Sequence, residues 1–531
     1  MSIPISRRGP DSPLLFLSVD AKDDRPLFAQ VYDGLRQAIL DGRLAAGSRL
    51  PATRALAQDL DVSRSTVVLA FDQLRLEGYT EGRRGAGTYV RDSIPDRLLR
   101  PSEGHRKAAG EADGTGRADS SRIERPGLSK RGAQLAAAGS TFRSLAGRPP
   151  TPLELGVSAV DAFPVRTWAR LAGRRWRTEQ VPLDDGDPAG HPALREVVRG
   201  YVVQARAARC SADQVLITNG AQQALDLVAR VLLDPGEPAW IEDPGYFGAR
   251  VALSAAGARL VPVPVDGEGL DVEAGIRAAA KARLACVTPS HQFPLGAVMS
   301  ASRRLALLAW ARRANAWIVE DDYDSEFRYE GRPLACLQGL EAQRPDAPGA
   351  ARVLYVGTFS KTLVPGLRLG YLVVPDRLVD AFRAARAVQD GHTPIPGQLM
   401  LADFLGEGHY ARHLRRVRAL CEERQAALRS AAQTFLPDLL SVAPDPAGLH
   451  VVGRLAAGIP EAAAVEAAAL EGVVVSPLSR YYLQPPGEAP ESAPGALLLG
   501  YAGFDEERIR SAVEALGRAL RGLSPTPARA R

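Results

Sequence analysis

Residues 358–371 read T-F-S-K-T-L-V-P-G-L-R-L-G-Y, and most of the chain is organised around this stretch. The apolar runs on either side of it predict two buried strands. Between them lie the hydroxyls of Thr358 and Ser360, the amine of Lys361 and, seven residues later, the guanidinium of Arg368. An amine in these surroundings suits a Schiff base to a phosphorylated aldehyde. The tripeptide Ser-Lys-Thr alone would equally fit an ordinary surface loop.

From about residue 151 onward, helical and strand-like segments alternate, which predicts an α/β sheet covered on both faces. Two of its turns carry suggestive side chains just after a predicted strand. Ala221 and Gln222 open a helix after a glycine turn, where free N–H groups suit a phosphate. Tyr246 is placed to stack on an aromatic ring. Each turn taken alone is also typical of ordinary strand-to-helix connections and core packing.

Carboxylates gather at the end of another predicted strand, residues 317–324, which read W-I-V-E-D-D-Y-D. An isolated cluster of this kind would suggest magnesium. Lys361 follows about forty residues later, so one carboxylate can instead keep a pyridine nitrogen protonated while a tyrosine hydroxyl binds the phenolic oxygen of the ring. The turn at residues 288–296, T-P-S-H-Q-F-P-L-G, places His291 and Gln292 after a further strand.

Together these segments resemble the pyridoxal-phosphate (PLP) domain of class I aminotransferases, which have fold type I; the resemblance covers roughly residues 151–520. It implies that Lys361 is the catalytic Schiff-base lysine, that Asp321 faces the pyridine nitrogen and that Tyr323 faces the phenolic oxygen. It also implies that Tyr246 stacks on the ring. The expected phosphate-binding residues are Ala221, Gln222, Thr358, Ser360 and Arg368.

The chain departs from the aminotransferase pattern at three places. Aminotransferases usually have Asn-Pro-x-Gly where residues 293–296 read F-P-L-G, so Gln292 or His291 is the expected substitute for the asparagine. Residues 497–501, L-L-L-G-Y, lack the usual arginine for a substrate carboxylate, and Arg480 is the best remaining cation. Residues 184–188 lack the tyrosine that often reaches a neighbouring subunit's phosphate. These losses affect turnover more than the cofactor pocket.

The N-terminal segment, about residues 20–91, predicts three helices and a hairpin. Apolar residues recur at helical spacing over residues 27–40, a second helix follows Pro51, and Ser63 is a good N-cap for a third. Helices joined so tightly are typical of a helix-turn-helix, whose second helix enters the major groove of DNA. Residues 79–90 alternate like a hairpin with a basic, glycine-rich tip that suits phosphates or the minor groove. A generic helical bundle is the alternative for each helix alone.

This segment resembles the winged helix of GntR-type regulators through P-A-T-R-A-L-A at 51–57, V-S-R-S-T-V at 62–67 and R-R-G-A-G-T-Y-V at 83–90. With both domains, the chain resembles MocR-type regulators, the GntR branch that carries an aminotransferase-like sensor. The resemblance implies a double-stranded DNA operator, an amine or amino-acid effector and a second copy of the chain as partners. The implied DNA contacts are Arg54, Arg64, Ser65, Thr66, Arg83, Arg84 and Gly85.

Residues 92–150 are rich in Gly, Ser, Ala, Arg and Glu and have no sustained apolar period, which predicts a flexible basic linker. Residues 124–148 are also compatible with a segment that covers the surface of the second domain. We therefore expect a winged-helix domain at 20–91, a linker at 92–150 and an aminotransferase-like domain at 151–525.

Composition excludes several other classes of protein. The 531 residues are 46% hydrophobic and 24% charged, as in an ordinary soluble protein. Four cysteines without a C-x-x-C pair argue against disulfides and structural zinc, and no run suits a membrane span or a signal peptide. These features predict a cytoplasmic protein with neither a metal site nor a membrane partner. The net charge of +5 hints only weakly at a polyanion.

Three functions are compatible with the sequence. The leading hypothesis is a dimeric transcription regulator, in which PLP on Lys361 meets an amine effector and the domains shift. The second is a genuine aminotransferase, converting an amino acid to a 2-oxo acid, with a fused DNA-binding arm. The third, a pseudo-enzyme without cofactor, is disfavoured because Lys361 and Asp321 are both present. Amino acids, amines and PLP itself stay open as effectors.

Overall fold

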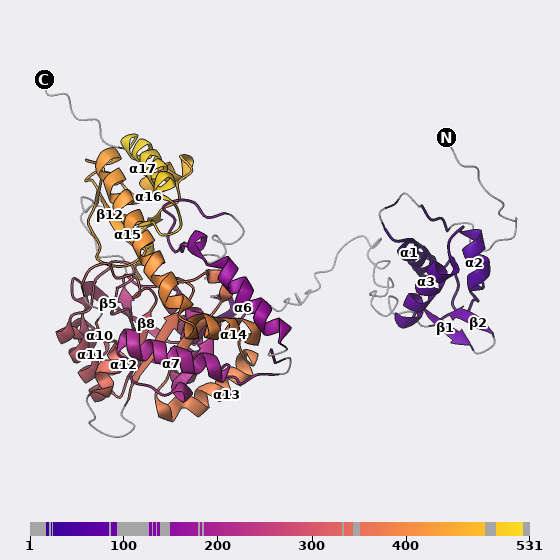
Figure 1. Cartoon of the computed structure of the whole chain (residues 1–531), viewed down its shortest axis with the longest axis horizontal. Coiled ribbons are helices and arrows are strands. Elements are labelled where there is room, and N and C mark those ends of the chain that lie inside the picture. Colours follow the sequence, from indigo (N-terminus) through magenta and orange to yellow (C-terminus); the bar gives the residue numbers. More distant parts are fainter. Residues whose placement is uncertain are drawn as a thin grey trace, which may run out of the picture. The chain divides into compact units, whose positions relative to one another are not determined.

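The structure is a computed structural model of the whole chain. It describes residues 17–20, 23, 25–83, 86–92, 127–129, 131–133, 135–137, 149–178, 181–182, 185–331, 334–343, 351–483 and 495–523. The chain divides into two compact units, Met1–Glu124 and Arg125–Arg531 (Figure 1). Among the described residues, no helix is both long and apolar enough to cross a membrane.

The first unit is a three-helix winged helix. Its helices are α1 (Leu27–Leu40), α2 (Thr53–Asp59) and α3 (Arg64–Leu76), and the antiparallel strands β1 (Thr80–Arg83) and β2 (Gly87–Val90) form the wing. Ser63 caps α3, since its hydroxyl accepts a hydrogen bond from the Thr66 amide at 3.1 Å. Val31, Leu35, Leu56, Val67 and Leu74 are fully buried in one core. The predicted winged helix-turn-helix is confirmed.

The second unit contains a sheet of eight strands in the order β3-β10-β9-β8-β7-β4-β5-β6. The strands β9, β8, β7, β4 and β5 lie side by side in this order and are parallel. Strand β10 is antiparallel to both of its neighbours, and β6 is antiparallel to β5. The strands are β3 (Val215–Thr218), β4 (Pro238–Asp243), β5 (Arg259–Asp266), β6 (Gly269–Leu270), β7 (Leu284–Val287), β8 (Trp317–Asp322), β9 (Val353–Thr358) and β10 (Gly370–Val373).

Helices cover both faces of this sheet. Successive strand residues point to opposite sides, and both sets are apolar, so each face packs against helices. Val319 and Val356 pack with α8 (Ala221–Leu232), α9 (Phe247–Ala255) and α13 (Val379–Asp390). Their neighbours Ile318 and Tyr355 pack on the other face, which is covered by α7 (Pro192–Arg206), α10 (Val272–Ala279), α11 (Ala301–Ala314) and α14 (Ile395–Gly406). The predicted α/β class is confirmed.

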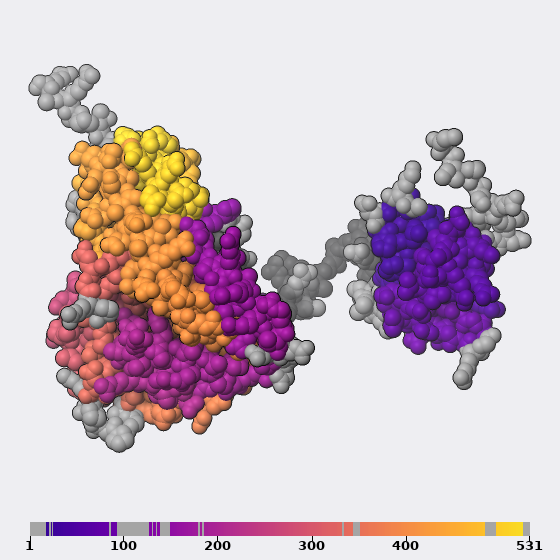
Figure 2. Space-filling model, in the orientation of Figure 1, coloured from indigo at the N-terminus to yellow at the C-terminus, as the bar shows by residue number. Residues whose placement is uncertain are grey.

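A second, four-stranded antiparallel sheet forms the C-terminal lobe, in the order β11-β12-β14-β13. Its strands are β11 (Leu440–Val442), β12 (His450–Leu455), β13 (Ser476–Pro477) and β14 (Ala496–Gly500). Its core also includes residues of α15 (His409–Phe435), α16 (Glu461–Leu470) and α17 (Glu506–Arg521). Figure 2 shows α15 and α17 on one face of this unit, with α6 (Val165–Arg177) beside α15.

Short helices complete the second unit, namely η2 (Val160–Ala162), η3 (Ala212–Gln214), α12 (Leu337–Ala342), η4 (Pro365–Leu367), η5 (Asp376–Leu378) and η6 (Leu478–Tyr481). Part of the predicted linker lies against this unit as well. The guanidinium of Arg131 donates to the carbonyl oxygen of Ala256 at 3.5 Å. This contact agrees with the possibility that residues 124–148 cover the surface of the second domain.

Candidate functional site

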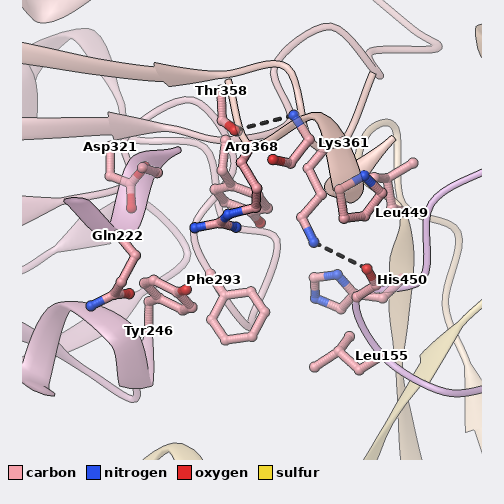
Figure 3. Close-up of a pocket in the computed structure, with 15 residues that line it drawn as sticks. Leu155, Gln222, Tyr246, Phe293, Asp321, Thr358, Lys361, Arg368, Leu449 and His450 are labelled. Atoms are coloured by element: carbon pink, nitrogen blue, oxygen red, sulfur yellow. Dashed lines mark hydrogen bonds between the residues drawn. The ribbon is translucent and has the colours of Figure 1, made fainter. Parts of the chain in front are cut away.

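A cavity of about 260 Å³ lies at the carboxyl ends of the parallel strands. This is the edge at which open α/β sheets bind ligands, since the loops that follow neighbouring strands converge there. Figure 3 shows Asp321, Gln222 and Tyr246 on one side of the cavity and Lys361, Leu449 and His450 on the other. The lining residues are Leu155, Gly156, Ala221, Gln222, Tyr246, Phe293, Asp321, Tyr323, Thr358, Ser360, Lys361, Pro365, Arg368, Leu449 and His450.

Lys361 projects into this cavity from the turn after β9. Its Nζ atom donates a hydrogen bond to the carbonyl oxygen of Gly156 at 3.2 Å. Burial lowers the pKa of the Lys361 amine, although the carboxylates of Asp324 and Asp321 oppose the effect. A lysine with a lowered pKa is more often in the neutral form that attacks a carbonyl group. The position and the electrostatics of Lys361 are therefore those of an amine nucleophile.

Asp321, the last residue but one of β8, carries a buried carboxylate. The side chain is 4% exposed, and its Oδ1 atom has no hydrogen-bond partner. Burial, together with the neighbouring charges of Asp322 and Glu242, raises its pKa to about 7. A buried carboxylate without a partner is costly, so this atom suits a cationic or N–H group in the cavity.

Polar groups of the turn before α8 and of the turn after β9 form an anion cradle. Gly220 precedes α8 with a φ of +90°, and this left-handed turn exposes the first N–H groups of the helix toward the cavity. Arg368 lies beside the turn and donates to the carbonyl oxygen of Asn219 at 2.8 Å. The Ser360 amide donates to Thr358 Oγ1 at 3.2 Å, which fixes the hydroxyl of Thr358 in this turn. Ala221 and Gln222 are the first two residues of α8.

Aromatic rings form another part of the wall. Tyr246 immediately precedes α9, and its ring meets that of Phe293 edge-on at 5.8 Å between centroids. Phe293 also contacts the ring of Tyr481 at 5.2 Å. Burial raises the pKa of Tyr246 to about 12, so its hydroxyl stays protonated. The structure thus brings together nine of the predicted cofactor residues, namely Ala221, Gln222, Tyr246, Asp321, Tyr323, Thr358, Ser360, Lys361 and Arg368.

His291 and Gln292, the expected substitutes for the missing asparagine, do not line this cavity. The Gln292 amide donates to the carbonyl oxygen of Pro244 at 2.9 Å and to Glu242 at 3.2 Å. His291 lies behind Tyr323, with Nδ1 at 3.1 Å from the tyrosine hydroxyl. The polar atoms of both side chains are already engaged within the protein, so the structure lends no support to a direct contact with a ring oxygen.

Arg480, the predicted carboxylate-binding residue, also lies outside the cavity lining. It belongs to η6 and its side chain is exposed. Its neighbour Tyr481 reaches the lining residue Phe293. The role of Arg480 therefore stays a prediction.

Sequence reasoning missed His450, Leu155 and Leu449, which line the cavity opposite Asp321. His450 begins β12 and is buried, with Nε2 at 3.0 Å from the carbonyl oxygen of Pro294. Burial and the nearby His291 lower the pKa of His450, which favours the neutral imidazole. A single histidine at the start of an apolar strand carries no local signal of this position. Among the described residues, no cluster of His, Cys, Asp and Glu side chains is placed to hold a metal ion.

The predicted DNA contacts lie on the winged-helix unit. Arg54, Arg64 and Ser65 are exposed, whereas Thr66 is half-buried and bonds to the N-cap Ser63. Arg83 is exposed on the wing, where its guanidinium lies 4.5 Å from the ring centroid of Tyr89. Arg84 and Gly85 lie outside the described residues.

Comparison with known proteins assigns both units to families. Residues 27–90 match the family of bacterial regulatory proteins called gntR, and residues 155–516 match aminotransferase class I and II. The probable rhizopine catabolism regulatory protein MocR of Rhizobium meliloti is 40% identical, over 96% of this chain and 97% of that protein. The pyridoxine biosynthesis transcriptional regulator PdxR of Corynebacterium glutamicum is 31% identical, over 91% and 93%.

Solved structures give the same assignment for the second unit. The α-aminoadipate aminotransferase LysN of Thermus thermophilus, solved with N-(5'-phosphopyridoxyl)-L-leucine, superimposes with a TM-score of 0.66 at 31% identity. The match covers 75% of this chain and 97% of the enzyme. This chain belongs to the MocR-type regulators, in which a GntR-family DNA-binding domain precedes a class I and II aminotransferase domain.

Proposed function

We propose that the protein is a dimeric, DNA-binding regulator of transcription that uses PLP to sense an amine or amino acid. The observation that carries the proposal is the convergence of Lys361, Asp321 and the α8 anion cradle on one cavity. The same chain begins with a winged helix. The sensing domain and the DNA-reading domain are thus parts of one molecule.

The residues of the cavity fit PLP. The unpartnered Oδ1 of Asp321 suits a protonated pyridine nitrogen, and Tyr246 suits stacking on the ring. The N–H groups of Ala221 and Gln222, with Thr358, Ser360 and Arg368, suit its phosphate. Bound there, PLP supplies an aldehyde that links to amines and a ring that withdraws electrons.

The protein's own groups set the conditions for amine recognition. Lys361 holds the cofactor, and its lowered pKa favours release of a proton from Nζ. Asp321 holds a proton at the ring nitrogen, where a hydrogen bond to a charged group is worth about 1.5–3 kcal/mol. Leu155, Leu449 and His450 form the wall next to the lysine, so these side chains would meet the effector.

A second copy of the chain is the proposed partner of the sensing domain, as the family membership implies. A dimer carries two winged helices, and linking them raises their local concentration at paired half-sites without new contacts. The chain between residue 92 and Arg131, which contacts the second unit, provides the tether. Its length leaves the spacing of the two half-sites open.

A spectral titration tests this function. The purified full chain, loaded with PLP, is mixed with a panel of amines and amino acids while the visible absorption band is followed. An effector should change the band and, at the same concentration, change the footprint of the protein on its promoter. Lys361→Ala should lose both responses, whereas Lys281→Ala, an exposed lysine outside the cavity, should keep both.

Genuine transamination is the second candidate, because the residues that the resemblance makes catalytic, Lys361, Asp321 and Tyr323, all line the cavity. The 2-aminoadipate transaminase of Thermus thermophilus is 32% identical over 69% of this chain. Sustained conversion of an amino acid to its 2-oxo acid would favour this candidate.

A further inference from the structure

His291 is buried and lies against three polar side chains, of which Asp324 is buried and Tyr323 and Asp445 are half-buried. Its Nδ1 atom lies 2.9 Å from Asp324 Oδ2 and 3.1 Å from the Tyr323 hydroxyl, and both residues follow β8 of the large sheet. Its Nε2 atom lies 3.3 Å from Asp445 Oδ2. Asp445 belongs to the connection between β11 and β12, in the C-terminal lobe. One imidazole thus bridges the two lobes of the sensing domain.

Two glycines, one in each lobe, permit this close approach. A Cβ atom at Gly448 would lie 2.2 Å from His291 Cε1, and one at Gly296 would lie 2.4 Å from Asp445 Oδ2. Both glycines have positive φ, +86° and +76°. The hydroxyls of Tyr329 and Tyr501 each donate to the carbonyl oxygen of Gly448 at 2.7 Å. The backbone on both sides is therefore shaped around the imidazole.

The charges of the cluster favour the doubly protonated imidazole. Burial alone would lower the pKa of His291, but the carboxylates of Asp324 and Asp445 raise it to about 10. As an imidazolium it donates from both nitrogens, toward the large sheet at Nδ1 and toward the C-terminal lobe at Nε2. The other titratable or charged groups that face it are Tyr323, His450, Arg206 and Arg328.

We propose that His291 is a positioning residue that fixes the Tyr323 hydroxyl to Asp445, so that the cofactor tyrosine and the C-terminal lobe move as one. This proposal rests on the proposed function for the role of Tyr323 at the cofactor. A change at the Tyr323 hydroxyl on effector binding then reaches the loop 445–448 through a single side chain. His291 itself touches neither cofactor nor effector.

Asp445→Asn tests the proposal, because it removes one charge of the bridge and leaves the cavity lining intact. In protein without PLP, hydrogen exchange of the amides of Asp445, Ala447 and Gly448 should accelerate by roughly tenfold or more, as expected when a hydrogen bond between charged groups is lost. In the PLP-loaded full chain, the pH titration of the visible band should shift from its wild-type midpoint. Asp438→Asn, an exposed aspartate of the same lobe, should change neither measurement.

The outcomes separate the two proposals. Unchanged exchange in Asp445→Asn overturns the bridge, and faster exchange with an unshifted band overturns the positioning role alone. If wild-type protein forms no visible band with PLP, the proposed function fails and the positioning role fails with it. Asp445→Glu, which restores the charge, should return both readings toward wild type. His291→Gln repeats the test if Asp445→Asn does not fold.

Discussion

Asp321 and Asp322 are neighbours in β8, yet their carboxylates have different environments. Asp321 lines the cavity, whereas Asp322 is paired in the buried interior, where its Oδ2 accepts a hydrogen bond from Arg206 Nε at 2.7 Å. The Oδ1 atoms of both carboxylates have no hydrogen-bond partner. Tyr355 also donates to Asp322. Successive side chains of a strand point to opposite faces, so adjacent aspartates acquire separate roles.

The first prediction compares these two aspartates. Asp321→Asn should weaken PLP retention or change its spectrum, because an amide cannot neutralise a pyridinium. Asp322→Asn should leave the cofactor spectrum near wild type but lower the free energy of unfolding, since breaking a buried ion pair costs about 3–5 kcal/mol. Dialysis with absorption spectroscopy measures the first effect and urea unfolding the second. Equal loss of cofactor in both variants would contradict the assignment of Asp321.

The second prediction concerns the pH dependence of the protein without PLP. The pKa of Asp321 is raised from 3.8 to about 7, so the folded state holds this proton more tightly than the unfolded chain. Its contribution to stability is therefore fully present below about pH 4 and is lost as the pH rises through about 7. Asp321→Asn should remove this part of the pH dependence. Parallel stability–pH curves of wild type and variant between pH 4 and 8 would show that Asp321 is not the titrating group.

The third prediction is that Lys361 carries the cofactor. Borohydride reduction of PLP-loaded protein, followed by digestion and mass spectrometry, should find the pyridoxyl group on Lys361. Lys361→Ala should lose the reducible adduct and Lys281→Ala should retain it. A pyridoxyl mass on any other lysine of the wild-type protein would show that the assignment is wrong.

The fourth prediction is that transamination is slow. Phe293 stands where the asparagine is usual, and Leu498, in the strand that usually carries the carboxylate-binding arginine, is fully buried in β14. The chain therefore holds PLP with fewer groups to orient a substrate for repeated turnover. We expect rates well below about 1 per second, an ordinary level for enzymes. Single-turnover and steady-state assays with amino acids and a 2-oxo acid measure this, and sustained faster turnover would favour the aminotransferase.

The fifth prediction concerns DNA. Arg64 begins α3, where base edges are read, and Arg83 lies on the wing. Arg64→Ala should cost about 1–3 kcal/mol of binding free energy and relax specificity at one base position, whereas Arg83→Ala should weaken all sequences more evenly and reduce the salt dependence. Footprinting across salt concentrations measures the affinity, specificity and salt dependence of both variants. Sedimentation counts the chains bound to each operator. A monomer on one half-site, or binding that survives deletion of residues 1–91, would exclude this architecture.

Both families and most of the residues that line the cavity could be predicted from the sequence. Local signals were sufficient there, because a lysine, its flanking hydroxyls and a glycine turn keep the same spacing wherever such a pocket is built. The winged helix could also be predicted from the sequence, because its apolar periods, its N-cap Ser63 and its hairpin are all short-range features.

Contacts between distant parts of the chain became evident only from the folded protein. His450 and Leu155 reach the cavity from segments almost 300 residues apart, and no local pattern reports such a contact. His291 was expected at the cofactor ring. It instead lies between Tyr323 and Asp445, and Asp445 is 154 residues further along the chain than His291. The physical reason is that a buried imidazole takes the place where paired carboxylates offset its desolvation, and those carboxylates meet only when the two lobes pack.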